Sequence, residues 1–265
     1  MTRPGSSDAL AFSVDGDIAF ITINRPGQRN ALSTDMLHRL HEIVTSIAHT
    51  GANALVVQSS TPSIFCAGAD VKEYAAHAGD PDWGLLSKAA VEAASAALCA
   101  CPVPTVAVVD GPCLGAGMSL LVACDIRLAT QSSSFGIPSV RLGLFYPFRD
   151  ARRLSESIGA HWARYLLLTA RILDGGDAFR VGLVDELYED RRGLEDRVTE
   201  LFGHFRTTSR TATVATKKCI AAAHAYDEEP EELEVLYRTA LEGDAYQEHL
   251  RRVGLTGASL TRERM

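Results

Sequence analysis

Two short loops of small residues are the parts of this sequence best suited to chemistry. Each follows a predicted buried strand and leads into a predicted helix: residues 65–70 (FCAGAD) and residues 115–117 (GAG). The first N–H groups of a helix lack intrahelical acceptors and lie at the positive end of the helix dipole, so they can stabilise an oxygen that becomes negative. Tight strand-to-helix connections without any function have the same pattern, so the loops alone leave both interpretations open.

Other kinds of reactive or ligand-binding site have little support. No G-x-G-x-x-G and no G-K-[ST] occurs, which argues against dinucleotide and nucleotide phosphate loops. The six cysteines include no C-x-x-C pair, so we expect buried free thiols. His38 and His41 have helical spacing but no further ligands nearby in the sequence, and we expect no metal site.

Composition narrows the class of protein. Hydrophobic residues make up 46% of the 265 residues and charged residues 22%, as in ordinary globular proteins. A formal net charge of -7 argues against a nucleic-acid partner. The longest apolar stretches are interrupted by residues 110–112, and residues 1–7 are polar, so we expect no membrane span or signal segment and a cytoplasmic location.

The elements that would position the two loops follow from hydrophobic spacing. Asp15-Gly16 indicates a hairpin within residues 10–23, and Ser33 is a plausible N-cap for a helix that ends near Gly51. We expect an α/β core over residues 1–190 and a helical oligomerisation region over residues 191–265. Further strands are predicted at residues 54–57, 103–109, 124–129, 132–135 and 184–188, and helices at residues 70–74, 82–100, 118–122, 149 onward, 190–206, 211–226 and 231–252.

Several motifs together resemble the crotonase family, also called the enoyl-CoA hydratase/isomerase family. The loop at residues 65–70 resembles the family's first oxyanion loop, and the resemblance extends over roughly residues 10–250. The other matching segments are residues 24–26 (NRP), 30–32 (NAL), 103–105 (VPT), 110–111 (DG), 115–117 (GAG), 123–125 (ACD), 135–136 (FG), 142–143 (LG) and 182–184 (GLV).

This resemblance implies a fold, a ligand and a set of contacts. The fold is a crotonase-like spiral of ββα repeats with a helical C-terminal extension, and the assembly is a homotrimer or hexamer. The ligand is an acyl-CoA thioester whose carbonyl oxygen accepts from the N–H groups of Ala69 and Ala116; CoA is part of the substrate, and no separate cofactor is implied. The implied CoA contacts are Arg25, Ala31, Ala67, Ala69, Asp70 and Val71. Asp125 is interpreted as a structural carboxylate.

The sequence departs from the family where hydratases carry their two catalytic glutamates. Those positions correspond here to Ser119 and Ser139. A serine hydroxyl keeps its proton at neutral pH, so neither serine can replace a carboxylate as an acid or base. Residues 142–148 resemble an isomerase branch, whose single glutamate again corresponds to Ser139, and a third branch has its acid where Pro147 stands. We therefore expect hydratase activity to be weak or absent.

Three functions stay open on the sequence alone. The first is an enzyme in which protons are moved either by Asp150 or by a water held by Ser119 and Ser139, although an aspartate at the start of a helix is more commonly a cap. The second is an acyl-CoA carrier or scaffold without catalysis. The third is a thioester hydrolase with Ser119 as nucleophile, which would need a distant histidine such as His161, because residues 78–160 contain none.

Overall fold

A six-stranded sheet is the centre of the first of two units into which the chain divides, residues 1–206 and residues 207–265. The structure is a computed structural model and describes residues 9–223 and 231–252. The strand order is β1-β2-β3-β4-β6-β9. The strands are β1 (Leu10–Asp15), β2 (Ile18–Ile23), β3 (Ala54–Ser59), β4 (Thr105–Val109), β6 (Ile126–Thr130) and β9 (Glu186–Tyr188).

The predicted hairpin opens this sheet. β1 and β2 pair antiparallel from Leu10 opposite Ile23 to Asp15 opposite Ile18, and Gly16 in the turn has a φ of +61°, which glycine adopts without strain. All later pairs in the sheet are parallel. Parallel strands need helical crossovers that cover both faces, and this explains why residues 54–57 are continuously apolar and buried.

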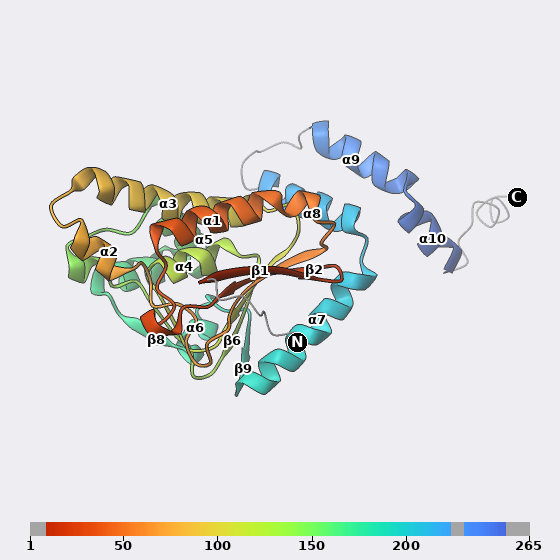
Figure 1. Cartoon of the computed structure of the whole chain (residues 1–265). Coiled ribbons are helices and arrows are strands. Elements are labelled where there is room, and N and C mark those ends of the chain that lie inside the picture. The colour runs from red at the N-terminus through yellow and green to blue at the C-terminus, as the bar shows by residue number, and fades with distance from the viewer. Residues whose placement is uncertain (1–8, 224–230, 253–265) are drawn as a thin grey trace, which may run out of the picture. The chain divides into compact units, whose positions relative to one another are not determined.

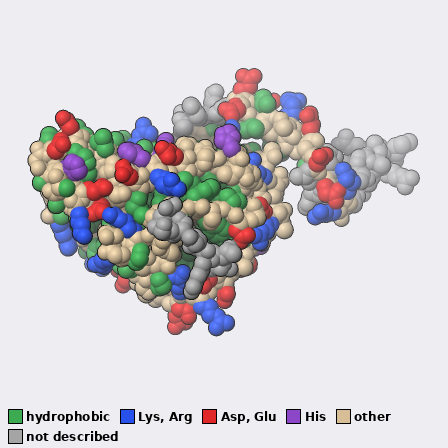
Figure 2. Space-filling model, viewed as in Figure 1, with side chains coloured by type: hydrophobic (Ala, Val, Ile, Leu, Met, Phe, Trp, Pro, Cys, Tyr) green, Lys and Arg blue, Asp and Glu red, His purple; other side chains and the backbone are tan. Residues whose placement is uncertain are grey.

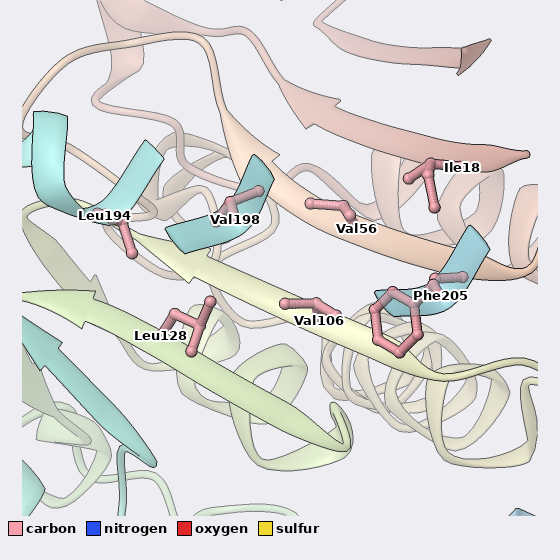
Figure 3. Close-up of a cluster of buried hydrophobic side chains, with 8 residues drawn as sticks. Ile18, Val56, Val106, Leu128, Leu194, Val198 and Phe205 are labelled. Carbon is pink, nitrogen blue, oxygen red and sulfur yellow. The ribbon is translucent and has the colours of Figure 1, made fainter. Parts of the chain in front are cut away.

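Helices cover the two faces of the sheet (Figure 1). α1 (Thr34–Ser46) and α3 (Pro81–Ala100) pack against each other, and Ser33 caps α1 by accepting from the N–H of Met36, as predicted. On the other face, α7 (Arg191–Thr207) presents Leu194, Val198 and Phe205 to side chains of β2, β3, β4 and β6 (Figure 3). The domain boundary was expected after residue 190, but α7 follows that residue and packs into the core of the first unit, which extends to Arg206.

A second, three-stranded sheet gives the fold its repeating character. It consists of β5 (Pro112–Leu114), β7 (Ser134–Gly136) and β8 (Ile172–Asp174) in the order β5-β7-β8. β4 and β5 are followed by α4 (Ala116–Ala123), and β6 and β7 are followed by α5 (Phe148–Thr169). Each repeat thus places one strand in each sheet and then a helix, which is the expected ββα arrangement.

The structure also corrects several predicted elements. β5 and β8 were not predicted, because three residues are too few to show a period of two. α4 begins at Ala116, two residues before its predicted start, and Gly159 interrupts the helical geometry of α5. The remaining α-helices in the described part of the first unit are α2 (Val71–Ala76) and α6 (Gly175–Arg180).

The second unit contains α8 (Arg210–Ala223), α9 (Glu231–Glu242) and α10 (Asp244–Arg252). Residues 231–252 were predicted to be rich in helix, and Gly243 separates two helices within them. Residues 224–226 of the helix predicted to end at residue 226, the tail after residue 252 and residues 1–7 lie outside the described part of the chain.

Two surface properties bear on the kind of partner. None of the helices in the described ranges is long and apolar enough to cross a membrane. On the visible face of the first unit, acidic and basic side chains are intermixed rather than gathered by sign (Figure 2). A nucleic-acid site needs a clustered basic surface, and this face does not present one.

Candidate active site

The two loops predicted to do chemistry meet through a short parallel bridge. The N–H of Cys66 donates to the carbonyl of Pro112 at 2.9 Å, and the N–H of Leu114 donates to the carbonyl of Cys66 at 2.9 Å. Gly68 allows the close approach, because a Cβ atom there would lie 3.3 Å from the Leu114 carbonyl oxygen and 3.8 Å from the Ala116 nitrogen. The structure thus brings the loops of Ala69 and Ala116 side by side.

The N–H groups of Ala69 and Ala116 remain available to a ligand. Ala116 is the first residue of α4, where an N–H has no intrahelical acceptor. Ala69 is bridged to Leu32, but the bonds are made by the N–H of Leu32 to Gly68 and the N–H of Asp70 to Leu32. Within the described residues, neither alanine N–H donates to a backbone carbonyl. The arrangement can therefore offer two donors to one oxygen.

The side chain of Arg25 organises the segment next to these donors. Its Nη1 atom donates to the carbonyl of Ala31 at 3.1 Å and to Oδ2 of Asp70 at 2.6 Å. Asp70 also caps α2 by accepting from the N–H of Lys72 at 2.9 Å. Burial acts to raise the pKa of Asp70, but hydrogen bonds and the charge of Arg25 hold that pKa below its usual value. Asp70 is thus a fixed carboxylate.

The remaining residues expected to contact CoA lie on the same segment. The N–H of Ala67 donates to the carbonyl of Arg29 at 3.1 Å, and Ala67 and Ala69 are half-buried. Val71 begins α2 with 66% of its surface exposed. The structure therefore brings all six predicted positions together. Ala67, Ala69 and Val71 are at least partly exposed, whereas Ala31 is buried and its carbonyl accepts from Arg25.

A second group of side chains converges on Ser119, which lies on the same helix as Ala116. Ser119 lies one turn along α4 from Ala116, and its hydroxyl donates to the phenol oxygen of Tyr146 at 3.0 Å. Asp150, in the first turn of α5, accepts at Oδ1 from Ser95 at 2.8 Å and from Arg153 at 2.7 Å. Ser119 and Asp150 are fully buried, and Tyr146 is 8% exposed.

Asp150 does not have the capping role that its sequence position suggests. The residue at the N-cap of α5 is Pro147, and no side chain caps that helix. The Oδ2 atom of Asp150 is buried and has no hydrogen-bond partner. Burial raises the pKa of Asp150, and this effect is only partly offset by the nearby hydroxyls of Ser119 and Ser95 and by Arg153. The carboxyl group therefore holds a proton more readily than an ordinary aspartate.

Other candidate residues have different surroundings. Ser139 lies in a 3-10 helix, Pro138–Leu142, where it is half-buried, and no hydrogen bond links it to Ser119. Asp125 accepts from the N–H and hydroxyl of Thr105 at 2.8 and 2.9 Å, which confirms its structural interpretation. Burial raises the pKa of Cys66 to about 12, so its thiol is not a ready nucleophile.

Sequence reasoning missed Ser95 and the contact of Tyr146 with Ser119. Ser95 lies on the buried face of α3, 55 residues before Asp150, among small apolar residues. A buried serine in such a helix face was the only available signal, and it identifies no partner.

The family model described as enoyl-CoA hydratase/isomerase matches residues 14–256. Human mitochondrial methylglutaconyl-CoA hydratase is 34% identical over 176 residues, which cover 66% of this chain and 51% of that protein. The matched region therefore spans about half the length of that curated relative.

Solved structures match over nearly the whole chain. An enoyl-CoA hydratase/isomerase family protein from Hyphomonas neptunium superposes with a TM-score of 0.87 and 29% identity, covering 92% of this chain and 94% of that one. An enoyl-CoA hydratase/carnithine racemase from Magnetospirillum magneticum gives a TM-score of 0.87 and 26% identity, with coverages of 93% and 92%. The predicted fold class, an α/β spiral with C-terminal helices, is confirmed by these matches.

Proposed function

The chain belongs to the enoyl-CoA hydratase/isomerase family, and we propose that it binds an acyl-CoA thioester and stabilises the enolate formed from it. The single observation that carries this proposal is the pair of N–H groups of Ala69 and Ala116, which have no backbone acceptor in the described residues and lie on two bridged loops. When a proton leaves the carbon next to a thioester, negative charge develops on the carbonyl oxygen. Two fixed donors stabilise that charge most strongly after the proton has left.

The proposed CoA contacts run along the segment that Arg25 organises. The ion pair between Arg25 and Asp70 fixes the start of α2. The adenine and pantetheine parts of CoA would contact the backbone of nearby residues, namely Ala31, Ala67, Ala69 and Val71. Because the guanidinium of Arg25 is already engaged by the carbonyl of Ala31 and the carboxylate of Asp70, we assign it to holding the cradle in shape.

We further propose that hydration of enoyl-CoA substrates is weak. Ser119 and Ser139 would occupy the positions of the two hydratase glutamates, and neither hydroxyl activates water as a carboxylate does. Ser119 is fully buried and bonded to Tyr146, so it is not placed as a free group facing solvent. Loss of one acid or base group commonly lowers a rate by about 10²–10⁴-fold, and here both would be missing.

Two alternatives differ in what the bound thioester undergoes. A carrier without catalysis fits the absence of glutamate at residues 119 and 139, because a binding site built from backbone does not depend on them. A thioester hydrolase is disfavoured, because the hydrogen-bond partner of Ser119 is Tyr146 and not a histidine. His161 is exposed on α5 and has a ring contact with Trp162.

One experiment separates these functions. Purified full-length protein is titrated calorimetrically with butyryl-CoA and crotonyl-CoA, and the same mixtures are followed by mass spectrometry in D₂O. We expect binding of both thioesters, incorporation of deuterium at the carbon next to the thioester, and hydration of crotonyl-CoA at least several hundred-fold slower than by a glutamate-bearing relative. Binding without deuterium incorporation would establish the carrier instead, and release of free CoA would establish the hydrolase.

A backbone donor can be removed by proline at a helix start. Ala116 is the first residue of α4, a position where proline is well tolerated, so Ala116→Pro deletes one N–H with little cost to the helix. We expect deuterium incorporation to fall about 10²–10³-fold. Glu231→Pro, at the first position of α9, is the matched control and should leave the rate unchanged. An unchanged rate in Ala116→Pro would refute the assignment of this donor.

Assembly as a homotrimer or hexamer and a cytoplasmic location stay predictions. Exposed apolar side chains between β7 and the first turn of α5, at Leu142, Leu144, Phe145 and Phe148, support association with other copies. Size-exclusion chromatography with light scattering at several concentrations tests the assembly, and a monomer at micromolar concentration would refute it.

A further inference from the structure

We propose that Asp150, Ser119 and Tyr146 form a proton chain that exchanges a proton with the carbon next to the thioester, an inference that rests on the function proposed above. In this chain Tyr146 contacts the substrate, Ser119 connects the other two groups, and Asp150 stores the proton. In this proton chain Ser119 comes from α4, Asp150 from α5 and Tyr146 from the loop before α5.

The first support is an unpartnered atom in a buried position. Asp150 is fully buried, its Oδ1 atom receives two hydrogen bonds, and its Oδ2 atom receives none. A buried carboxylate oxygen without a donor is unfavourable, because it has lost water and gained no partner. A proton on Oδ2 removes that cost, since the protonated atom can donate to a neighbouring hydroxyl.

The hydroxyl of Ser119 is placed to receive that proton. It lies near enough to Asp150 to act on the carboxyl group as a hydrogen-bond donor, although its hydrogen bond in the structure goes to Tyr146 at 3.0 Å. A hydroxyl has one proton and two acceptor sites, so it can accept from Asp150 while it donates to Tyr146. Ser119 therefore has the contacts needed for a link between an inner acid and an outer phenol.

The phenol of Tyr146 is the end of the chain that can meet a substrate. Its oxygen accepts from Ser119, and its own proton has no acceptor among the described residues. Tyr146 is 8% exposed, whereas Ser119 and Asp150 have no exposure. Ser119 also lies three residues after Ala116 on α4, so the two share a helix face. Ser119, the middle group of the proton chain, therefore lies about one helical turn from the proposed oxyanion donor, and Tyr146 is hydrogen-bonded to it.

The charged and titratable groups around Asp150 assign storage of the proton to Asp150. Arg153 on its own helix favours the carboxylate, the hydroxyls of Ser95 from α3 and Ser119 from α4 do the same, and burial opposes them. Tyr146 faces it from the preceding loop, and burial raises the pKa of that phenol well above 10. A phenol of this kind stays protonated at neutral pH, so it can pass a proton but does not hold the negative charge.

The transfer balances atoms and charge in both directions. In the forward direction the C–H bond next to the thioester breaks, and its electron pair moves to the carbonyl oxygen between the N–H groups of Ala69 and Ala116. For this step the Ser119 hydroxyl turns, so that it donates to the Asp150 carboxylate and accepts from Tyr146, the reverse of its hydrogen bond in the structure. The substrate proton then bonds to the oxygen of Tyr146, the phenol proton moves to Ser119 and the serine proton moves to Asp150. The reverse sequence returns a proton to carbon and leaves Asp150 as a carboxylate. No further reactant is required.

Three variants test the chain: Asp150→Asn, Ser119→Ala and Tyr146→Phe. Asparagine keeps an oxygen that accepts from Ser95 and Arg153, and phenylalanine keeps the ring, so we expect all three to fold. Deuterium incorporation into butyryl-CoA should fall about 10²–10⁴-fold in Asp150→Asn and Tyr146→Phe. Butyryl-CoA binding should change less than threefold, and the exposed tyrosine variant Tyr165→Phe serves as the control.

The pH profile distinguishes proton storage from a structural role. Removal of the proton requires ionised Asp150, so the wild-type rate should fall as pH drops through a pKa above the ordinary aspartate value of 3.8. Asp150→Asn should lose this acidic limb, and Tyr146→Phe should lose the rate without a change in butyryl-CoA affinity. If the wild type exchanges deuterium and Asp150→Asn has the same rate and the same acidic limb, the proton chain is refuted while the proposed function stands. Absence of butyryl-CoA binding to the wild type would refute the proposed function itself.

Discussion

The proposed site has two halves that are built in different ways. One half consists of backbone: the N–H groups of Ala69 and Ala116 on loops joined by the bridge between Cys66 and Cys113. The other half consists of side chains: Ser119, Tyr146 and Asp150, which come from separate segments. We expect the backbone half to tolerate side-chain replacements as long as the glycines remain, and we expect a single side-chain replacement in the other half to remove its proposed function.

The same contrast separates two aspartates that are both paired with arginine. Asp70 lies 2.6 Å from Arg25 and Asp150 lies 2.7 Å from Arg153, yet the pKa of Asp70 is lowered and that of Asp150 is raised. Asp70 accepts at both oxygens, whereas Oδ2 of Asp150 has no partner and the residue has no exposure. An arginine partner therefore does not by itself fix a carboxylate in its charged form; completion of its hydrogen bonds and the depth of burial decide.

The largest effect on the backbone half is expected from Gly68→Ala. Gly68 has a φ of +107°, and an added Cβ would lie 3.3 Å from the Leu114 carbonyl oxygen, so the loop must shift away from Ala116. Misplacement of the donors should lower deuterium incorporation into butyryl-CoA by about 10²–10³-fold. Gly27→Ala is the control, because a Cβ there meets nothing within 4 Å. Equal rates in the two variants would mean that loop spacing does not govern the reaction.

This difference between the halves also explains what the sequence could predict. The two loops, the hairpin at Asp15-Gly16 and the cap at Ser33 depend on residues close together in the chain, so they could be predicted. The proposed role of Asp150 depends on surroundings that include Ser95, 55 residues away, and local rules instead suggested a cap. β5 and β8 were missed because three-residue strands are specified by their neighbours in the sheet.

The next largest effect is expected from Ser119→Glu, which places a second carboxyl group beside Asp150. Residue 119 is fully buried, and an uncompensated buried charge commonly costs about 3–5 kcal/mol of stability. Adding Asp150→Asn should recover about 1–3 kcal/mol, because it removes the repulsion between like charges. Urea denaturation of the two single variants and the double variant measures this coupling.

Ser139→Glu is the matched control for that coupling. Ser139 is half-buried and no hydrogen bond joins it to Ser119, so its variant should lose less stability and show no coupling to Asp150→Asn. Equal coupling at both positions would mean that Asp150 is not specifically near Ser119. The combined Ser119→Glu, Ser139→Glu variant should also gain hydration of crotonyl-CoA if both positions correspond to the hydratase glutamates.

A smaller effect is expected from Asp70→Asn. The substitution replaces a charged acceptor of Arg25 with a neutral one, and loss of a charge-assisted hydrogen bond commonly costs about 1.5–3 kcal/mol. Asp80→Asn is the control, because Asp80 also caps a helix and asparagine caps equally well. The pKa of Asp70 is lowered on folding, so its contribution is present at neutral pH and is lost as pH falls below the ordinary aspartate range. Thermal melts from pH 7 to pH 3 should therefore show the gap between Asp70→Asn and wild type narrowing.

The smallest effect is expected from Asp150→Asn on the pH dependence of stability, which should be opposite to that of Asp70→Asn. The pKa of Asp150 is raised on folding, so the folded state binds more protons than the unfolded state between the two pKa values, and wild-type stability declines as pH rises through that window. Asparagine carries no such charge, so the stability of Asp150→Asn relative to wild type should improve from pH 4 to pH 7. This trend is opposite in sign to the trend at Asp70, where the variant is least favourable at neutral pH. The two melting series together test the central contrast: parallel trends would mean that Asp150 is an ordinary paired carboxylate, and its free oxygen would then have no role in holding a proton.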